Sequence, residues 1–405
     1  MSKELPRIIS VDDHVVEPPD LWLRYLPAKF RTLAPHVVRT RGGYRSDVRD
    51  TWFADESGEW ADIWHYEGYE MAINPGFAAV GKDQNALGDH WVPYIYDDMR
   101  PGCYQQDARL VDYDTNHTDA SLAFPTFPRF CGQTFLQHGD RDLSLACVQA
   151  YNDWMIDEWC AGPGYGRLIP LTLVPIWDPK LATEEVYRCA EKGSHAICFP
   201  EAMHPLGLET LYSGAWEPML RACDETSTVI NMHIGSSSLL PGTSPDASIG
   251  VTVALTHENA AHALCDWVFS GVLVRHPKLK VVLSEAQAGW IPFMLSRMDD
   301  VWERGEMYGT DLRETLPEPP STLVRSRIYS CIFNDIVGLN ARNEIGMEHL
   351  MFEVDYPHSD STFPLSMATA EKLIAEAGLN DEEAVQFVRG NAIECYDLGR
   401  WGIVK

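Results

Sequence analysis

The chain has 405 residues, a net charge of −27 and 45% hydrophobic residues, which is enough for a large core. This charge should repel nucleic acid and anionic membranes, so neither is expected as a partner. It would also repel an anionic substrate unless a metal or a few arginines reverse the field locally. No stretch approaches the ~18 apolar residues that a membrane span needs.

The ten cysteines occur singly between Cys103 and Cys395, without a C-x-x-C pair. In a chain of this length the pattern favours reduced, mostly buried thiols in a cytoplasmic protein over a disulfide framework. The polar segment Ser2–Arg7 leads directly into the first predicted strand, so no apolar signal region is expected. A small-molecule substrate is the expected partner, and a homo-oligomer is compatible with the composition.

Short apolar or β-branched runs alternate with helical stretches, which predicts a parallel α/β fold. The expected strands are Ile8–Val11, Ala120–Phe124, Leu168–Val174, Ala196–Phe199, Val229–Met232, Leu279–Leu283, Ile328–Ile332 and Leu350–Val354. Their number fits a single (β/α)8 TIM barrel spanning residues 1–405. A doubly wound open sheet is the alternative, but it favours a Gly-rich first turn where this chain has Asp12-Asp13-His14.

Roughly a hundred residues separate the first two predicted strands, more than a βα connection needs. Within them, segment 36–115 is rich in Trp, Tyr, Gly and Asp. An insertion after strand 1 emerges at the C-terminal face of a barrel, where active sites lie, so we expect a lid or pocket wall near the mouth. A surface excursion or an oligomer contact is the alternative. After the last strand, Leu365–Ala377 and a segment beginning at Asp381 are predicted to be helical.

Carboxylates and imidazoles stand at or just past the ends of three predicted strands. Asp12 and His14 lie two residues apart, so they share a face if strand 1 continues through them. His233 follows strand 5 and Asp355 follows strand 8. Because a parallel barrel gathers its strand ends, these four residues are predicted to bind one divalent metal ion. Each residue alone would more often be an ordinary hydrogen-bonded side chain.

The combination resembles the amidohydrolase superfamily, in the branch that contains aminocarboxymuconate semialdehyde decarboxylase and the metal-dependent hydroxybenzoate decarboxylases. The resemblance is carried by Ser10-Val11-Asp12-Asp13-His14, Asn231-Met232-His233, Leu283-Ser284-Glu285, Val354-Asp355-Tyr356-Pro357-His358 and Gly390-Asn391-Ala392. It implies that Asp12 and His14 replace the family's H-x-H or E-x-H ligands, with His233 and Asp355 completing the set. Two carboxylates and two imidazoles favour Zn²⁺, with Mn²⁺ and Fe²⁺ as alternatives.

The chain departs from these decarboxylases after strand 6, where they typically carry a catalytic histidine and this chain has Glu285. A glutamate beside metal-bound water is a plausible general base for hydrolysis. Equally, it would act as an acceptor that orients His233. Asp355 is expected to double as proton acceptor. His358 is expected to contact substrate or donate a proton, with a structural role as the alternative.

Further candidates follow strands 2, 5 and 6. Arg129 would pair with a substrate carboxylate, or with the acidic insertion. His257 and Trp290 are expected to bind substrate, and Phe293 to line the same apolar pocket, with core packing as the alternative for the aromatic residues. Glu258 and His262 lie four residues apart and would share a helix face, as a second metal site or simply as solvated side chains.

These features predict a metal-dependent hydrolase that acts on a C–N or C–C bond of a small, cyclic or aromatic carbonyl compound. The first alternative is a non-oxidative decarboxylase of an aromatic or muconate-type acid. Two further alternatives are an oxygenase with two metals on the same fold, and a non-catalytic barrel whose vestigial metal site is structural.

Overall fold

The computed structural model describes residues 5–45, 48–82, 92–244, 246–309 and 312–404. The first three residues of the polar start, Ser2–Glu4, lie outside the described residues, as do residues 46–47 and 83–91 of the predicted insertion.

Parallel strands form two sheets, of three strands in the order β1-β6-β7 and of six strands in the order β13-β12-β11-β10-β9-β8. The strands of these sheets are β1 (Ile8–Val15), β6 (Thr118–Pro125), β7 (Leu168–Ile169), β8 (Thr172–Leu173), β9 (Ala196–Cys198), β10 (Val229–His233), β11 (Val281–Ser284), β12 (Ile328–Ile332) and β13 (Leu350–Phe352). The α/β class is therefore confirmed. The strand predicted over Leu168–Val174 is interrupted at Pro170, which has no backbone N–H to donate to a ladder.

The outer strands of the two sheets lie next to each other. The Asp355 backbone N–H donates to the Asp12 carbonyl over 2.9 Å, just past the end of β13. The Val354 N–H donates to the Ser10 hydroxyl, also over 2.9 Å. At the opposite edges, β7 pairs with β6, and β8 pairs with β9. These two edge strands, β7 and β8, are close in the chain, because β7 ends at Ile169 and β8 begins at Thr172. An open doubly wound sheet would leave its outer strands apart.

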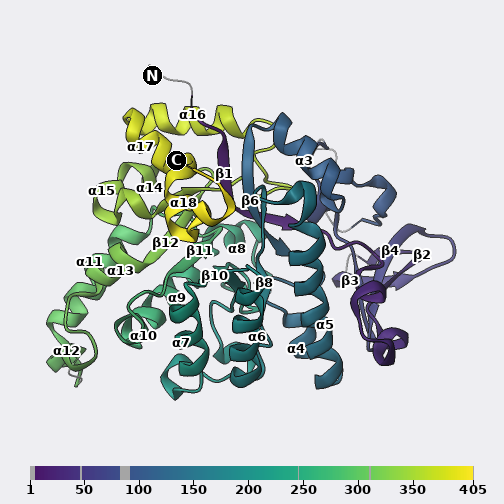
Figure 1. Ribbon diagram of the computed structural model, residues 1–405, viewed down its shortest axis with the longest axis horizontal. Coiled ribbons are helices and arrows are strands. Elements are labelled where there is room, and N and C mark those ends of the chain that lie inside the picture. Colours follow the sequence, from purple (N-terminus) through teal and green to yellow (C-terminus); the bar gives the residue numbers. More distant parts are fainter. Residues whose placement is uncertain (1–4, 46–47, 83–91, 245, 310–311, 405) are drawn as a thin grey trace.

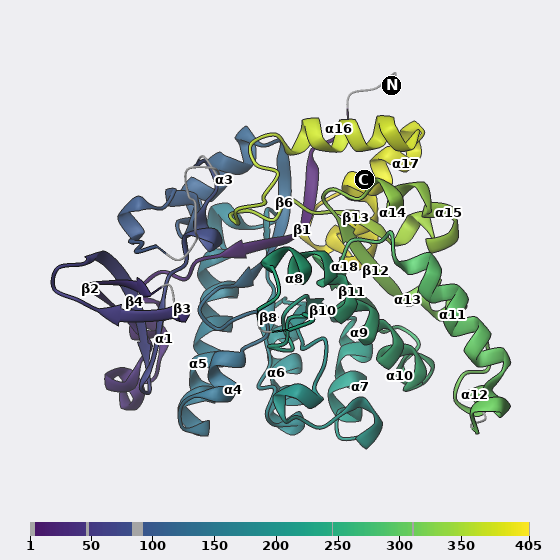
Figure 2. The ribbon, with the colours of Figure 1, turned by 180° about the vertical axis from the view of Figure 1, so that it is seen from behind.

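Helices lie between the parallel strands in the sequence and follow the last of them. They are α1 (Leu21–Tyr25), α3 (Gln106–Thr115), α4 (Gln133–Gln137), α5 (Arg141–Trp154), α6 (Pro179–Glu191), α7 (Glu217–Thr226), α8 (Ile249–Leu255), α9 (His257–Phe269), α10 (Val272–Arg275), α11 (Ile291–Glu303), α12 (Leu312–Thr315), α13 (Pro320–Arg327), α14 (Ile336–Asn340), α15 (Arg342–Ile345), α16 (Ser366–Ala377), α17 (Asp381–Val385) and α18 (Asn391–Tyr396). Long helices such as α5, α6, α7 and α11 flank the strands (Figures 1 and 2). The two helices predicted after the last strand correspond to α16 and α17, and Asn380 caps α17 through a capping box. No helix in the described part of the chain is long and apolar enough to cross a membrane.

The segment between β1 and β6 carries a separate antiparallel sheet in the order β3-β2-β4-β5. Its strands are β2 (His36–Arg45), β3 (Val48–Ala54), β4 (Glu59–Tyr66) and β5 (Tyr69–Ala72). The sheet lies at one side of the molecule, at the right of Figure 1 and the left of Figure 2. Buried Trp64 of β4 stacks on Phe127 after β6 at 4.7 Å between ring centroids, which anchors the sheet to the parallel strands.

Ser10 supports the junction of β1 and β13, and Ser10→Ala tests that role. The variant leaves the Val354 N–H without its acceptor and removes the 2.8 Å hydrogen bond to Asp13 Oδ1. We expect the free energy of unfolding, measured by urea titration, to fall by about 1–3 kcal/mol. Ser326→Ala is the control, because that exposed hydroxyl bonds only within its own helix, and its effect should stay within about 0.5 kcal/mol. Equal effects would show that Ser10 does not hold the junction.

Candidate active site

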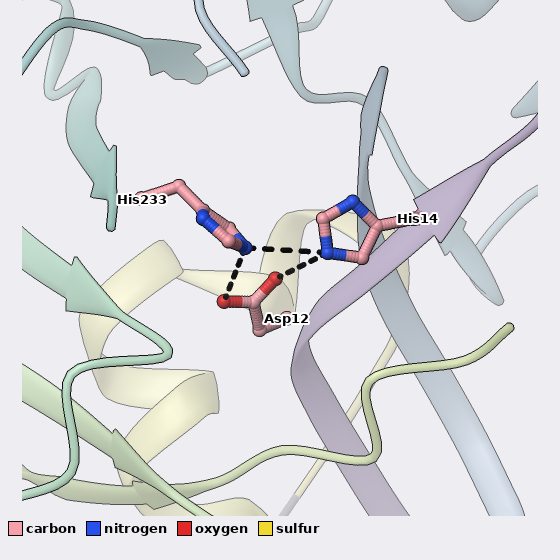
Figure 3. Close-up of side chains that lie close together, drawn as sticks. All are labelled: Asp12, His14 and His233. Carbon is pink, nitrogen blue, oxygen red and sulfur yellow. Dashed lines mark hydrogen bonds and ion pairs between the residues drawn. The ribbon is translucent and has the colours of Figure 1, made fainter. Parts of the chain in front are cut away.

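Three side chains from β1 and β10 converge at the carboxyl ends of these strands (Figure 3). The Nε2 atoms of His14 and His233 face each other at 3.3 Å. Asp12 places Oδ1 3.6 Å from His14 Nε2 and Oδ2 3.7 Å from His233 Nε2. Two donors that share a zinc ion tetrahedrally lie about 3.4 Å apart, so these spacings fit one shared ion.

Asp355 approaches the same point from the end of β13. Its Oδ1 lies 3.3 Å from His14 Nε2 and 3.0 Å from His358 Nδ1, and the His358 ring stacks on His14 at 3.6 Å. Asp355 adopts φ 57°, a left-handed conformation that is uncommon for a residue other than glycine and often marks functional sites. The structure therefore brings Asp12, His14 and His233 into one group of ligand atoms and His14, Asp355 and His358 into an adjoining one, and His14 belongs to both.

The acids of this cluster are buried with few partners. Neither carboxylate oxygen of Asp12 accepts a hydrogen bond from the described residues, whereas Oδ1 of Asp355 has His358 Nδ1 at 3.0 Å. Burial, reinforced by Glu353, Asp355, Glu285 and Asp13, raises the pKa of Asp12 well above its usual value. Burial also lowers the pKa of His14 well below its usual value. Buried carboxylates need a cation or a proton, and unprotonated imidazoles are ligands, so the residues fit a divalent metal ion.

The tautomer of His233 is fixed by its own backbone neighbour. Nδ1 lies 2.7 Å from the Ile234 carbonyl, which only accepts, so Nδ1 donates and Nε2 keeps its lone pair. Glu285 places Oε2 3.0 Å from that same Nε2. Glu285 therefore approaches the side of the ring that would face a metal. Like Asp355, Glu285 has a positive φ, of 56°.

Glu353 is a buried acid that the sequence analysis did not single out. It lies two residues before Asp355, accepts the Glu285 backbone N–H at 3.3 Å, and has an unpartnered Oε1 among the described residues. Burial, followed by the charges of Glu285 and Asp355, raises its pKa well above the usual value. The signal was present as Glu353-x-Asp355, the same two-residue spacing that drew attention to Asp12 and His14.

His358 carries a proton readily. Burial alone would lower its pKa, but Asp355, Glu285 and Asp360 outweigh that effect and raise the pKa to about 9. The side chain is largely buried yet lines the cavity next to the cluster. A protonated imidazole there would offer an acidic N–H to a bound molecule.

A cavity of about 710 Å³ opens onto the cluster. His14 and His358 line it, as do Arg129 and Phe130 of the loop after β6. Tyr44, Trp52, Glu70, Asn74 and Phe77 extend the lining into the segment between β1 and β6. Arg129 forms no ion pair with the described carboxylates, so the expected pair with the acidic insertion does not form there. Its guanidinium is available to an acidic ligand.

The other candidates lie elsewhere. His257 and Trp290 have ring centroids 6.4 Å apart, and neither is among the residues that line the cavity. Phe293 is 68% exposed, so it neither packs in the core nor lines the pocket. Glu258 and His262 are exposed on α9 and belong to neither of the ligand groups that the described residues form, Asp12–His14–His233 and His14–Asp355–His358. Of the two alternatives for their spacing, the described residues form no second metal site there, and the exposure agrees with solvated side chains.

The chain belongs to the amidohydrolase family, whose profile matches residues 20–398. The match begins after Asp12 and His14, so the pairing of these two residues with the family's ligands rests on the geometry above. Gamma-resorcylate decarboxylase from Rhizobium sp. (strain MTP-10005) is 23% identical over 279 residues, which cover 64% of this chain and 78% of that protein. The enzyme of the same name from Rhodococcus jostii (strain RHA1) is also 23% identical, covering 64% and 79%.

Solved structures share the fold. An amidohydrolase from Mycobacterium avium subsp. paratuberculosis has a TM-score of 0.70 at 20% identity, over 97% of this chain and 100% of that one. A 2,6-dihydroxybenzoate decarboxylase from Rhizobium has a TM-score of 0.59 at 15% identity, covering 98% and 100%. A 5-carboxyvanillate decarboxylase from Novosphingobium aromaticivorans, complexed with manganese and 4-hydroxy-3-methoxy-5-nitrobenzoic acid, also scores 0.59 at 16% identity, covering 97% and 96%.

Removing one imidazole tests the metal site. His233→Ala should lower the metal content of purified protein, measured by mass spectrometry, by about tenfold or more, since even partners of ligands affect affinity by about 10–100-fold. His257→Ala is the matched control, because it removes the same side chain from a position outside the cluster, and it should retain the metal. Full occupancy in His233→Ala would contradict the assignment of this ligand.

Proposed function

We propose that this protein is a metal-dependent carboxy-lyase that removes carbon dioxide from an aromatic or similarly unsaturated acid. The observation that carries the proposal is Arg129, a cation without an ion pair to a described carboxylate, in a cavity that also reaches His14 and His358. An arginine placed this way suits a carboxylate substrate, which the net charge of −27 would otherwise repel. Decarboxylases among the curated relatives support the same class.

We further propose that the two parallel sheets are arcs of one closed (β/α)8 barrel, formed by a single domain over residues 1–405. The links between β1 and β13 and between β7 and β8 support closure. Segment 36–115 would then be an insertion that builds a wall of the active-site mouth, since Tyr44, Trp52 and Phe77 line the cavity.

Asp12, His14, His233 and Asp355 would hold one divalent ion. Two nitrogen and two oxygen donors suit Zn²⁺, the metal favoured from the sequence, and also Mn²⁺, which accompanies one related structure. When bound, the ion would supply a positive charge that fixes the acid and withdraws electrons from it. Metal analysis of the purified protein distinguishes the two ions and gives their number per chain.

The chemical step needs a proton at the carbon that loses its carboxylate. The C–C bond breaks, its electron pair stays on that carbon, a proton is taken up there, and carbon dioxide leaves. His358 is placed to donate this proton, because it lines the cavity and its pKa is raised to about 9. Asp355, at 3.0 Å, would hold the imidazolium in place and favour its protonated form.

Hydrolysis is the second candidate, and Glu285 favours it. Its carboxylate lies 3.0 Å from the metal-facing nitrogen of His233, where it would accept a proton from a nucleophilic water. Burial raises the pKa of Glu285, which makes it a better base than an exposed glutamate. A C–N or C–C bond beside a carbonyl would be the target.

Isotope labelling decides between the two reactions. The metal-loaded enzyme is offered hydroxylated and carboxylated benzoic acids, including those named for the relatives, in heavy-oxygen water and separately in deuterium oxide. Decarboxylation predicts carbon dioxide release, one deuterium on the product carbon and no solvent oxygen in the organic product. Labelled oxygen in the organic product, without carbon dioxide release, would refute the carboxy-lyase and support the hydrolase.

Arg129→Met tests whether the Arg129 guanidinium binds the acid group of the substrate. Loss of the guanidinium should raise KM for an acidic substrate by about 10–100-fold, the usual range for a hydrogen bond to a charged group, with metal content unchanged. Arg24→Met is the control, because Arg24 pairs with Glu158 instead of lining the cavity, and it should leave KM within about twofold. An unchanged KM in Arg129→Met would remove Arg129 from substrate binding.

A further inference from the structure

The nitrogen of His233 that faces away from the cluster is held by a backbone peptide. His233 turns Nε2 toward Asp12 and His14 (Figure 3), and its Nδ1 donates to the Ile234 carbonyl over 2.7 Å. That carbonyl belongs to the same planar unit as the Gly235 N–H, and the peptide bond between them is trans. The carbonyl and the N–H of a trans peptide point in opposite directions. A group that binds the Gly235 N–H therefore also fixes the acceptor of the imidazole.

Glu201 binds this N–H from the neighbouring strand connection. The residue follows β9, which pairs with β10, and it is 2% exposed. Its Oε1 accepts the Gly235 N–H over 3.0 Å. The same oxygen accepts the Ser237 N–H over 3.2 Å, the Ser237 hydroxyl over 2.7 Å and the Asn259 side-chain amide over 3.0 Å. One buried carboxylate thus holds the chain just beyond His233.

The other side of the imidazole is held by an aromatic ring. Phe130 stacks on His233 with 4.1 Å between ring centroids and 7° between ring planes. Gly235 adopts φ 81°, and a Cβ on it would lie 3.3 Å from the Phe130 ring. Glycine suits this position because it adopts a positive φ without strain and leaves room for the stacked ring. The imidazole is therefore held on one face by Phe130 and at Nδ1 by the peptide that Glu201 binds.

The charge of Glu201 would reach His233 through this peptide. Hydrogen bonds to an ionised group are roughly twice as strong as neutral ones, and hydrogen bonds in series polarise one another inside a protein. A carboxylate on the Gly235 N–H makes the carbonyl of the same peptide a stronger acceptor, which makes Nε2 more basic toward a metal. Burial raises the pKa of Glu201, and hydrogen bonds from Ser237 and Gly235 oppose that rise because they favour the carboxylate.

We propose that Glu201 is a positioning residue for His233 that acts through the peptide unit of Ile234 and Gly235. It orients the imidazole and raises its affinity for the metal ion, without contact with the ion or the substrate. Metal-binding histidines commonly use a carboxylate directly for this purpose, and here one peptide unit stands between the two side chains. The inference rests on the metal site of the proposed function and adds a residue that supports it.

Glu201→Gln tests the role of the carboxylate, because it keeps the size of the side chain and removes its charge. We expect the Kd for Zn²⁺, measured by competition with a chromogenic chelator, to rise about tenfold, the lower end of the range for partners of metal ligands. Glu185→Gln is the matched control. Glu185 is also 2% exposed and accepts the Asn152 side-chain amide over 2.6 Å, but it lies on α6, outside both ligand groups. This variant should lower the urea midpoint and leave the Kd within about twofold.

A double-mutant cycle distinguishes a role through His233 from a general loosening of the loop. In the His233→Ala background, Glu201→Gln should change the remaining affinity for Zn²⁺ by less than about twofold, because the imidazole on which it acts is gone. An equal loss in both backgrounds, or an unchanged Kd in Glu201→Gln alone, would overturn the inference and leave the proposed function intact.

Glu201→Asp replaces Glu201→Gln if the latter does not fold. It withdraws the carboxylate from the Gly235 N–H by one methylene, so the same rise in Kd is expected, and an unchanged Kd would again overturn the inference. A wild-type protein that binds no divalent ion would refute the proposed metal site, and this inference would fail with it.

Discussion

The site is organised around four buried acids, Asp12, Glu285, Glu353 and Asp355, which have only imidazoles and one backbone N–H as partners among the contacts described above. Burial, together with the charge of Asp355, raises the pKa values of Asp12, Glu285 and Glu353. Without a bound cation, the protein would reduce the repulsion between these carboxylates by taking up protons. A divalent cation relieves it while keeping the carboxylates ionised and the imidazoles neutral, which accounts for why these residue types meet at one point.

A second network holds the strand that carries two of these residues. Asp13 accepts the Tyr113 hydroxyl over 2.7 Å and the Tyr356 backbone N–H over 3.2 Å. Buried Arg109 donates to the His14 carbonyl over 2.7 Å, and its guanidinium lies 4.2 Å from the Tyr356 ring centroid. These contacts join β1, α3 and the segment after β13. Asp12 and His14 are thereby positioned by neighbours that point away from the cluster, and the middle residue of Asp12-Asp13-His14 is structural because alternate residues of a strand face opposite sides.

Regular elements made much of this architecture predictable from sequence. The apolar runs located the parallel strands, and β12 coincides with the predicted Ile328–Ile332 because a buried parallel strand is a continuous apolar run. Polar residues at strand ends then predicted which side chains would meet. Tertiary contacts were harder to predict. The role of the antiparallel sheet of β2 to β5 as a cavity wall depends on how the sheet docks, with Trp64 packed on Phe127, and these two residues are far apart in the sequence.

The distance of a residue from the end of its strand explains which substrate-binding candidates reach the cavity. Arg129 follows β6 directly, so the strand carries it to the face where the cluster lies, whereas His257 stands more than twenty residues past β10, within a helical excursion. Distance along the chain from a strand end thus limits how well side-chain placement can be inferred. The substrate proposed above raises an electrostatic question, because an acid must approach a protein with a net charge of −27. Arg129 and a bound cation would reverse the field only within the cavity, so an acid would be attracted at its binding position while the rest of the surface repels it.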